Sequence, residues 1–357
     1  MKIRGAGVVL AVLLSAVPGG FVAAQNFPAR LVRIVSSAPG NLSDIMARIH
    51  YDTSHKGRLL QRTLIGYLGH AFERFPVSWD EIREVTVAAN TTMRDLFFGL
   101  DVYPIGQKPY RSLTESEFRA GTRATTSLSA SGRNFTLPLT REASVYGLPL
   151  LGSHVGADAA ACLLATGLAE RSEVSVVMDI GTNTELIVGN RDRIVAASCP
   201  AGPAFEGGGV LCGMPALDGA IERVAINDDG TNRLEVIGGG EPHGICGSGL
   251  VDLLSEMVRT ERMNAQGRFV DSYGGRYSVH ESGVFFAETD VNELAQAKGA
   301  NVAGLRIAAD VYGIDLDQID RFYLAGGFAL HIDISAAKRI GLIPNLPDEK
   351  DRKSTRL

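Results

Sequence analysis

The chain has 357 residues, of which 45% are hydrophobic and 41 are glycine, so it is long enough for two compact domains or one large core. Its 35 basic and 40 acidic residues are interspersed and give a formal charge of −5, which leaves no basic stripe for nucleic acid. The cysteines, Cys162, Cys199, Cys212 and Cys246, lie far apart without a CxxC pair, so local sequence builds neither a zinc nor an iron–sulfur site and predicts reduced thiols in a cytosolic protein.

Residues 1–24 contradict that compartment because they have the pattern of an export signal. Lys2 and Arg4 precede an apolar run over 6–17, and small residues follow it. The run is too short to cross a bilayer, so no membrane anchor is expected. Residues 25–40, which contain FPARLVRIV and then APG, resemble the start of the mature Bug-type periplasmic receptors for carboxylate solutes, and this resemblance stops at residue 40.

The next part of the chain alternates strand-like and helix-like segments, which is typical of a layered α/β protein. Residues 85–89 predict a buried strand that runs into a helix ending at residue 100, and residues 107–140 lack a strong period and predict a long surface excursion. Residues 59–75 predict a helix whose apolar face consists of Leu60, Leu64, Tyr67, Leu68 and Ala71.

The second half has clearer periodicity. Three strands are predicted, at 174–180, 185–188 and 194–197, and three antiparallel strands in succession open a ribonuclease-H-like sheet. Residues 246–263 and 291–312 predict long helices. A strand at 322–324 follows, so the motifs below fall at strand ends or helix starts, where ligands bind in open α/β sheets.

The sharpest motif is DIGTNTE at residues 179–185, at the bend between the first two strands. A phosphate-binding hairpin needs a glycine where the backbone approaches oxygen atoms, side chains that donate hydrogen bonds, and a carboxylate for the water shell of Mg²⁺. This segment supplies all three. An ordinary tight β-turn is the alternative reading, because the DxGT pattern is short.

A second motif, AGGF at 325–328, closes a strand and opens a helix, and paired glycines there let the backbone pass close to a base or a phosphate. A DxGT hairpin followed by such a strand end resembles the superfamily of actin, sugar kinases and heat-shock chaperone ATPases. That resemblance implies an actin-like α/β fold in which two ribonuclease-H-like lobes clamp ATP.

Further blocks narrow the resemblance to the reductive activators of corrinoid proteins. They are NTTM at 90–93, GAD at 156–158, CPAGPAFEG at 199–207, GICGSGL at 244–250 and the helix segment 290–300. The resemblance implies ATP-dependent reduction of cob(II)alamin to cob(I)alamin in a partner methyltransferase system, with a corrinoid protein as partner. The charge pattern and the short apolar run predict no nucleic-acid or membrane partner, and the sequence is compatible with a homodimer.

The resemblance also implies a site. Asp179 would be catalytic and would organise water on Mg²⁺, and hydrolysis would be slow and would gate electron transfer. The residues expected to hold ATP are Gly181, Thr182, Asn183 and Thr184 at the phosphates, Gly326, Gly327 and Phe328 at the adenosine, and in addition Glu206, Gly247, Ser248, Gly249 and Lys298.

The sequence departs from the family pattern at both ends. Upstream of residue 41 it has neither the ferredoxin-like cysteine cluster nor a first DxGT hairpin, so we expect no iron–sulfur cluster and no activation by this chain alone. Residues 351–357 read like a translated sequencing adapter. We therefore expect a truncated activator whose residues 41–172 form an incomplete first lobe and 173–350 a second lobe, joined to a foreign export signal outside the folded domain; a genuine gene fusion is the alternative.

Alternatives stay open at several points. An acyl or sugar kinase of the same superfamily is the rival enzyme, and a periplasmic carboxylate receptor is the rival suggested by the first 40 residues. ATP chemistry favours a cytoplasmic body. His154 and His331 are expected to be surface or core residues rather than ligands, and Asp158 to cap a helix rather than face a cleft. Lys298 has a solvated helix face as its alternative.

Overall fold

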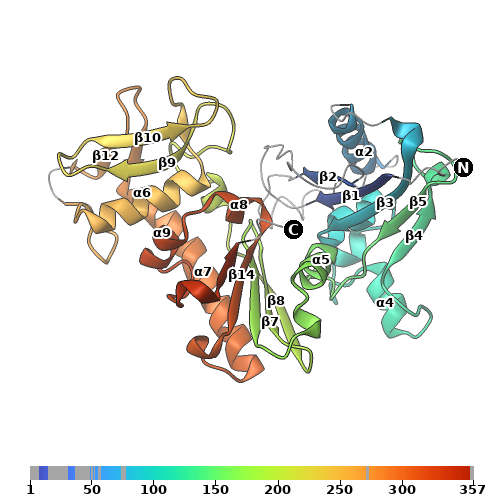
Figure 1. The fold of residues 1–357 in the computed structure, drawn as a ribbon. Coiled ribbons are helices and arrows are strands. Elements are labelled where there is room, and N and C mark those ends of the chain that lie inside the picture. Colours follow the sequence, from blue (N-terminus) through green and yellow to red (C-terminus); the bar gives the residue numbers. More distant parts are fainter. Residues whose placement is uncertain are drawn as a thin grey trace, which may run out of the picture. The chain divides into compact units, whose positions relative to one another are not determined.

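The computed structural model describes residues 8–14, 31–36, 49, 51, 53–54, 58–73, 78–270 and 273–353 (Figure 1). Among these residues, the chain forms two compact units, the first ending at Leu164 and the second beginning at Ala165. The division falls inside one helix, a few residues before the boundary at 172 that the sequence predicts.

The first unit is built on a five-stranded sheet. Its order is β2-β1-β3-β5-β4, with only β4 antiparallel to its neighbour. The elements of this part of the chain are β1 (Val8–Leu14), β2 (Leu31–Ser36), α2 (Leu59–Phe72), η1 (Trp79–Glu81), β3 (Ile82–Ala89), α3 (Thr91–Phe97), η2 (Tyr103–Gly106), α4 (Leu113–Arg119), β4 (Leu128–Ser131), η3 (Gly132–Asn134), β5 (Ser144–Gly147) and α5 (Ala157–Thr166), which crosses into the second unit.

The strands β1 and β2 differ from the sequence expectation, which placed the first 40 residues outside the folded domain. β1 pairs in parallel with β3, and β2 pairs in parallel with β1. The run of Val, Leu and Ala in β1 suits a strand as well as an export signal, because both require continuous apolar residues. The other residues of the predicted export signal and receptor-like segment lie outside the described part of the chain.

Two further expectations in this unit are wrong. Tyr67 is 70% exposed, whereas Leu64 and Leu68 are buried, so the apolar face of α2 is narrower than predicted. Residues 107–140 are also not an irregular surface segment throughout. They contain α4, whose N-cap Ser112 accepts a hydrogen bond from Glu115 N–H, and the edge strand β4.

The second unit is built on a five-stranded sheet of order β15-β14-β6-β7-β8. β6, β7 and β8 are antiparallel, as predicted, and β14 runs parallel to β6. The elements of this unit are η4 (Leu168–Glu170), β6 (Ser175–Asp179), β7 (Thr184–Gly189), β8 (Ile194–Cys199), η5 (Ala204–Glu206), β9 (Ala220–Ile226), β10 (Asn232–Val236), β11 (Gly244–Ile245), α6 (Gly247–Arg259), β12 (Arg276–Ser278), β13 (Phe285–Ala287), α7 (Glu288–Tyr312), η7 (Leu316–Gln318), β14 (Arg321–Ala325), α8 (Gly326–His331), α9 (Ile334–Arg339), η8 (Asp348–Lys350) and β15 (Asp351–Lys353).

One large hydrophobic core joins this sheet to the helices. It includes Met178 and Leu186 of the sheet, Leu250 of α6 and Leu305 of α7, all nearly fully buried. α7 lies against β7 and β8, and α6 lies against β9 and α9. The core fixes the C-terminal ends of β6 and β14 side by side, and the predicted motifs stand at those ends.

The end of the chain also differs from expectation. Residues 351–353, which the sequence places in a foreign tail, form β15 and pair in parallel with β14. The Asp351 carboxylate forms an ion pair with the Lys338 ammonium group at 2.5 Å, so residues 351–353 belong to the folded second unit. Residues 354–357 lie outside the described part of the chain.

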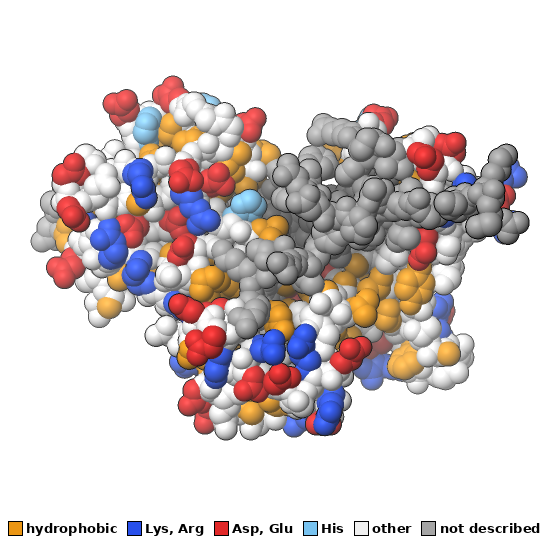
Figure 2. Space-filling model, viewed as in Figure 1, with side chains coloured by type: hydrophobic (Ala, Val, Ile, Leu, Met, Phe, Trp, Pro, Cys, Tyr) orange, Lys and Arg blue, Asp and Glu red, His pale blue; other side chains and the backbone are white. Residues whose placement is uncertain are grey.

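The surface carries charges of both signs. Acidic and basic side chains are interspersed over the second unit on the face shown in Figure 2. Among the helices that the structure describes, none has the length and apolar character needed to cross a membrane.

Candidate nucleotide site

The DIGTNTE segment forms the bend between β6 and β7. Asp179 ends β6 and pairs with Glu185, and Thr184 begins β7. Gly181 and Asn183 in the bend are half-buried, so both remain accessible to a ligand. The structure thus turns a seven-residue pattern into a hairpin that offers backbone N–H groups and one carboxylate at the same end of the sheet.

The AGGF segment lies directly beside this hairpin. Ala325, the last residue of β14, is the parallel partner of Asp179. Gly326 follows with a φ of 86°, and a Cβ there would overlap the Asp179 carboxylate oxygen Oδ1. Glycine is therefore required at 326 for both backbone conformation and space. This contact brings together the two motifs that sequence reasoning linked only by their order.

Glu206 holds the bend between β6 and β7 through hydrogen bonds from Thr182. The Thr182 N–H donates to Glu206 Oε1 at 3.0 Å, and the Thr182 hydroxyl donates to Oε2 at 2.6 Å. Gly202 N–H donates to the Thr182 carbonyl at 2.9 Å. The block at 199–207 therefore holds the bend between β6 and β7 in place. Burial raises the pKa of the Glu206 carboxyl, although the two Thr182 hydrogen bonds oppose that rise.

Gly247 brings α6 and α8 together at the same place. A Cβ at Gly247 would overlap the Phe205 carbonyl oxygen and would lie 2.8 Å from Phe328 Cε2. The rings of Phe205 and Phe328 have centroids 5.9 Å apart. Sequence reasoning missed Phe205, although it lies inside the block 199–207. Phe328 and the glycines before it are half-buried and accessible to a ligand.

Other predicted residues are less accessible. Ser248 and Gly249 are buried, and a Cβ at Gly249 would overlap the Ile221 carbonyl, so this glycine allows α6 to pack against β9. The Thr184 side chain is fully buried. Lys298 Nζ lies 3.4 Å from where a Cβ at Gly341 would be, which places it beside the residues that follow α9.

The residues present fit a nucleotide with one Mg²⁺. No cluster of three His, Cys, Asp or Glu side chains that could hold a metal occurs within the described ranges. Mg²⁺ keeps several waters and is bound through one or two carboxylates and the substrate phosphates, so it does not need such a cluster. Asp179 next to the bend and to Gly326 satisfies that requirement.

The first unit brings two predicted blocks together. A Cβ at Gly156 would lie 2.7 Å from Asn90 Cα, so the NTTM and GAD blocks meet at the end of β3. Asp158 is the second residue of α5 and accepts from Ala159 N–H at 2.8 Å, so it lies in the first turn of the helix and not at the N-cap position that the sequence predicts. Burial raises the pKa of Asp158 to about 6.

The two histidines that sequence analysis set aside lie on the surface. His154 is exposed and has its ring 6.4 Å from that of Tyr110. The His331 side chain is half exposed and lies 3.9 Å from Glu222.

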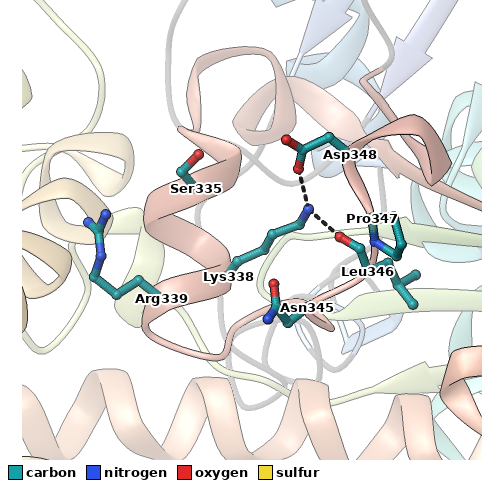
Figure 3. Close-up of a pocket in the computed structure, with 7 residues that line it drawn as sticks. All are labelled: Ser335, Lys338, Arg339, Asn345, Leu346, Pro347 and Asp348. Carbon is teal, nitrogen blue, oxygen red and sulfur yellow. Dashed lines mark hydrogen bonds and ion pairs between the residues drawn. The ribbon is translucent and has the colours of Figure 1, made fainter.

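A surface hollow of about 610 Å³ lies between α9 and η8. In Figure 3 the Lys338 side chain points toward the Leu346 carbonyl and the Asp348 carboxylate, and it donates to them at 2.6 and 2.8 Å. The residues lining it are Ser335, Lys338, Arg339, Asn345, Leu346, Pro347 and Asp348. The Lys338 charge is already met by carboxylates, so we do not assign the hollow to nucleotide phosphates.

Replacing Glu206 by glutamine is expected to change how stability depends on pH. The raised pKa in the folded protein means that stability linked to Glu206 is complete below its ordinary pKa of 4.5 and is lost as pH rises through the folded value. Glutamine does not titrate but can keep both contacts with Thr182. Urea unfolding at pH 5 and pH 8 should show the variant gaining on the wild type at the higher pH. The exposed control Glu235→Gln should not, and parallel behaviour of Glu206→Gln and wild type would contradict the assignment.

Family models match most of the chain. A model described as the C-terminal domain of RACo, the ASKHA domain, matches residues 173–353, and one described as the RACo middle region matches residues 41–171. The two matched ranges adjoin at residues 171–173. The first match includes residues 351–353, which the sequence placed in a foreign tail.

Curated relatives and a solved structure agree with these matches. "Corrinoid activation enzyme RamQ" of Eubacterium limosum is 29% identical over 333 residues, which are 85% of this chain and 54% of that protein. "[Co(II) methylated amine-specific corrinoid protein] reductase" of Methanosarcina barkeri is 22% identical over 325 residues, covering 84% of this chain and 59% of that protein. A solved "Reductive activator for corrinoid,iron-sulfur protein" has 32% identity and a TM-score of 0.73, covering 87% of this chain and 52% of its own. The chain therefore spans little more than half the length of these proteins.

Proposed function

Because the chain belongs to the RACo family, whose C-terminal ASKHA domain spans residues 173–353, we propose that it supplies the nucleotide-binding part of a reductive activator of corrinoid proteins. The proposed reaction is ATP-dependent reduction of cob(II)alamin to cob(I)alamin in a partner methyltransferase system. The observation that carries the nucleotide site is the contact between Asp179 and Gly326, which joins the phosphate bend to the strand end beside it. A reaction that consumes ATP places the body of the chain in the cytoplasm.

In this proposal each part of the site has one task. Asp179 orders the water shell of Mg²⁺, and backbone N–H groups of the bend around Gly181 bind phosphate oxygens. Gly326 to Phe328 pass close to the adenosine. Glu206 acts on the bend through Thr182 rather than on the ligand itself. ATP hydrolysis supplies the conformational gating of electron transfer.

The names of the relatives favour this reading over an acyl or sugar kinase and over a periplasmic receptor. The test is co-sedimentation of the chain with a purified corrinoid protein in the Co(II) state, with and without Mg²⁺ and ATP. We expect complex formation to depend on nucleotide. Phosphate transfer to an acyl or sugar acceptor, or a complex that ignores nucleotide, would contradict the proposal.

The electron is proposed to come from outside the four cysteines of this chain. None of the four forms a disulfide with another, and no metal-binding cluster occurs in the part of the chain that the structure describes. The purified chain should therefore contain no stoichiometric iron. With a chemical reductant and ATP under anaerobic conditions, absorption spectroscopy should show no cob(I)alamin formation whose rate depends on the chain. Bound iron, or such a rate, would show that the cysteines had been misread.

A further inference from the structure

Asn301 is a buried amide without a partner. Its side chain is fully buried in α7, and neither Oδ1 nor Nδ2 has a hydrogen-bond partner among the described residues. Its neighbours along the buried stripe of α7 are apolar: Leu294, Ala297, Leu305 and Ala308. An amide in the middle of an apolar stripe requires a reason, because buried polar groups are nearly always paired.

Thr184 is a second buried group of the same kind. Its side chain is fully buried, and Oγ1 has no hydrogen-bond partner in the described part of the chain. Thr184 is the first residue of β7 and directly follows the phosphate bend. A displacement of Thr184 therefore moves the backbone that is proposed to hold phosphate.

The topology places Asn301 at the Thr184 end of the sheet. A Cβ at Gly304 would overlap Cys199 Sγ and would lie 3.0 Å from Leu186 Cδ1. Cys199 is the cross-strand partner of Thr184, so Gly304 already lies close to that end.

The direction of α7 completes this placement. Arg193, in the far hairpin of the sheet, donates to the Tyr312 carbonyl at 3.2 Å, so α7 ends at the far side. Asn301 comes about one turn before Gly304, in the direction of Thr184.

The stability of the fold does not explain why positions 301 and 184 carry polar side chains. Each buried unsatisfied polar group destabilises a protein, whereas apolar groups of similar shape at both positions would be neutral or stabilising. We therefore propose that Asn301 is a positioning residue of the nucleotide site that acts through Thr184 to fix the phosphate bend. This inference rests on the proposed function, and it adds a residue outside the motifs.

Asn301 works in the nucleotide-bound state. Its amide then bonds to the Thr184 hydroxyl, directly or across one internal water, for which three polar atoms provide sufficient partners. The bond restrains the backbone between Asp179 and Thr184. Gly181 and Asn183, which are accessible in the bend, are thereby held in the conformation that receives phosphate.

A double-mutant cycle tests this pair in the full chain. The variants are Asn301→Leu, Thr184→Val and the two combined, with affinity for Mg²⁺-ATP measured by calorimetry and stability measured in urea without nucleotide. Each single substitution should lower the affinity for Mg²⁺-ATP about tenfold. The double variant should bind as well as the more weakly binding single variant, because the two residues share one interaction. Stability without nucleotide should be unchanged or higher.

Leu305→Ala is the matched control, one turn further along the same buried stripe. It should lower stability by leaving a cavity but should leave nucleotide affinity unchanged. The proposal is overturned if Asn301→Leu raises stability without weakening binding, or if the two substitutions weaken binding additively. If wild type binds no nucleotide, the proposed function fails first. The proposal fails with it, because the contact belongs to the nucleotide-bound state, whereas a wild type that binds while Asn301→Leu binds equally well overturns the proposal alone.

Discussion

Gly326→Ala should abolish most nucleotide binding and also destabilise the second unit. Alanine at a φ of 86° costs about 1–2 kcal/mol in backbone strain. Its methyl group would also overlap Asp179 Oδ1, and overpacking of this kind costs about 1–3 kcal/mol unless a side chain moves. The side chain that must move is the proposed Mg²⁺ ligand, so relief of the overlap removes Asp179 from the site.

Gly313→Ala separates the two effects. Gly313 has a φ of 95° and no atom within 4 Å of its Cβ position, so it should show backbone strain alone. Urea unfolding gives the stability of both variants, and calorimetry gives their affinity for Mg²⁺-ATP. The account would be contradicted if Gly326→Ala matched Gly313→Ala in stability and also bound nucleotide normally.

Asp179→Asn should remove the contribution of Mg²⁺ to ATP binding. Asparagine keeps the shape of the side chain beside Gly326 but not its charge, so the fold should be retained. Interactions with a charged group are worth about 1.5–3 kcal/mol, which corresponds to roughly a tenfold to hundredfold loss of affinity. The measurement is ATP affinity with Mg²⁺ and with a chelator, for wild type and variant.

The expected pattern is specific to the metal. Wild type should bind ATP more tightly with Mg²⁺, and Asp179→Asn should bind it equally weakly in both conditions. Asp192→Asn, in the far hairpin and with a 74% exposed side chain, is the matched control and should behave as wild type. An undiminished Mg²⁺ effect in Asp179→Asn would remove this carboxylate from the site.

The helices and strands of the second unit could be predicted from the sequence because the patterns that specify them are local. β-branched runs predict β6, β7 and β8, and the apolar stripe predicts α6 with Leu250 and Leu254 buried. The motifs are recognisable because the proposed phosphate binding demands particular residue types at short spacing. Their meeting at Asp179 and Gly326 depends on the parallel pairing of β14 with β6, which joins residues far apart in the chain.

Other features depend on long-range contacts that no local pattern carries. Residues 107–140 lack a period because their helix and strand are short, and Tyr67 was placed by spacing although nothing covers that side of α2 among the described residues. The apolar run of β1 suits both an export signal and a strand, and the structure shows it paired with β3. The sequence does not single out Asn301, because its place on the helix predicts only that it is buried. The proposed role comes from Thr184, which lies at the same end of the sheet and also has no hydrogen-bond partner among the described residues.

The most direct test of the account is calorimetric titration of the wild-type chain with ATP in the presence of Mg²⁺. The account predicts one site per chain, with binding weakened both by Asp179→Asn and by Gly326→Ala. Absence of binding, or binding that survives both substitutions, would contradict the claim that the bend after β6 and the strand end after β14 form one nucleotide site.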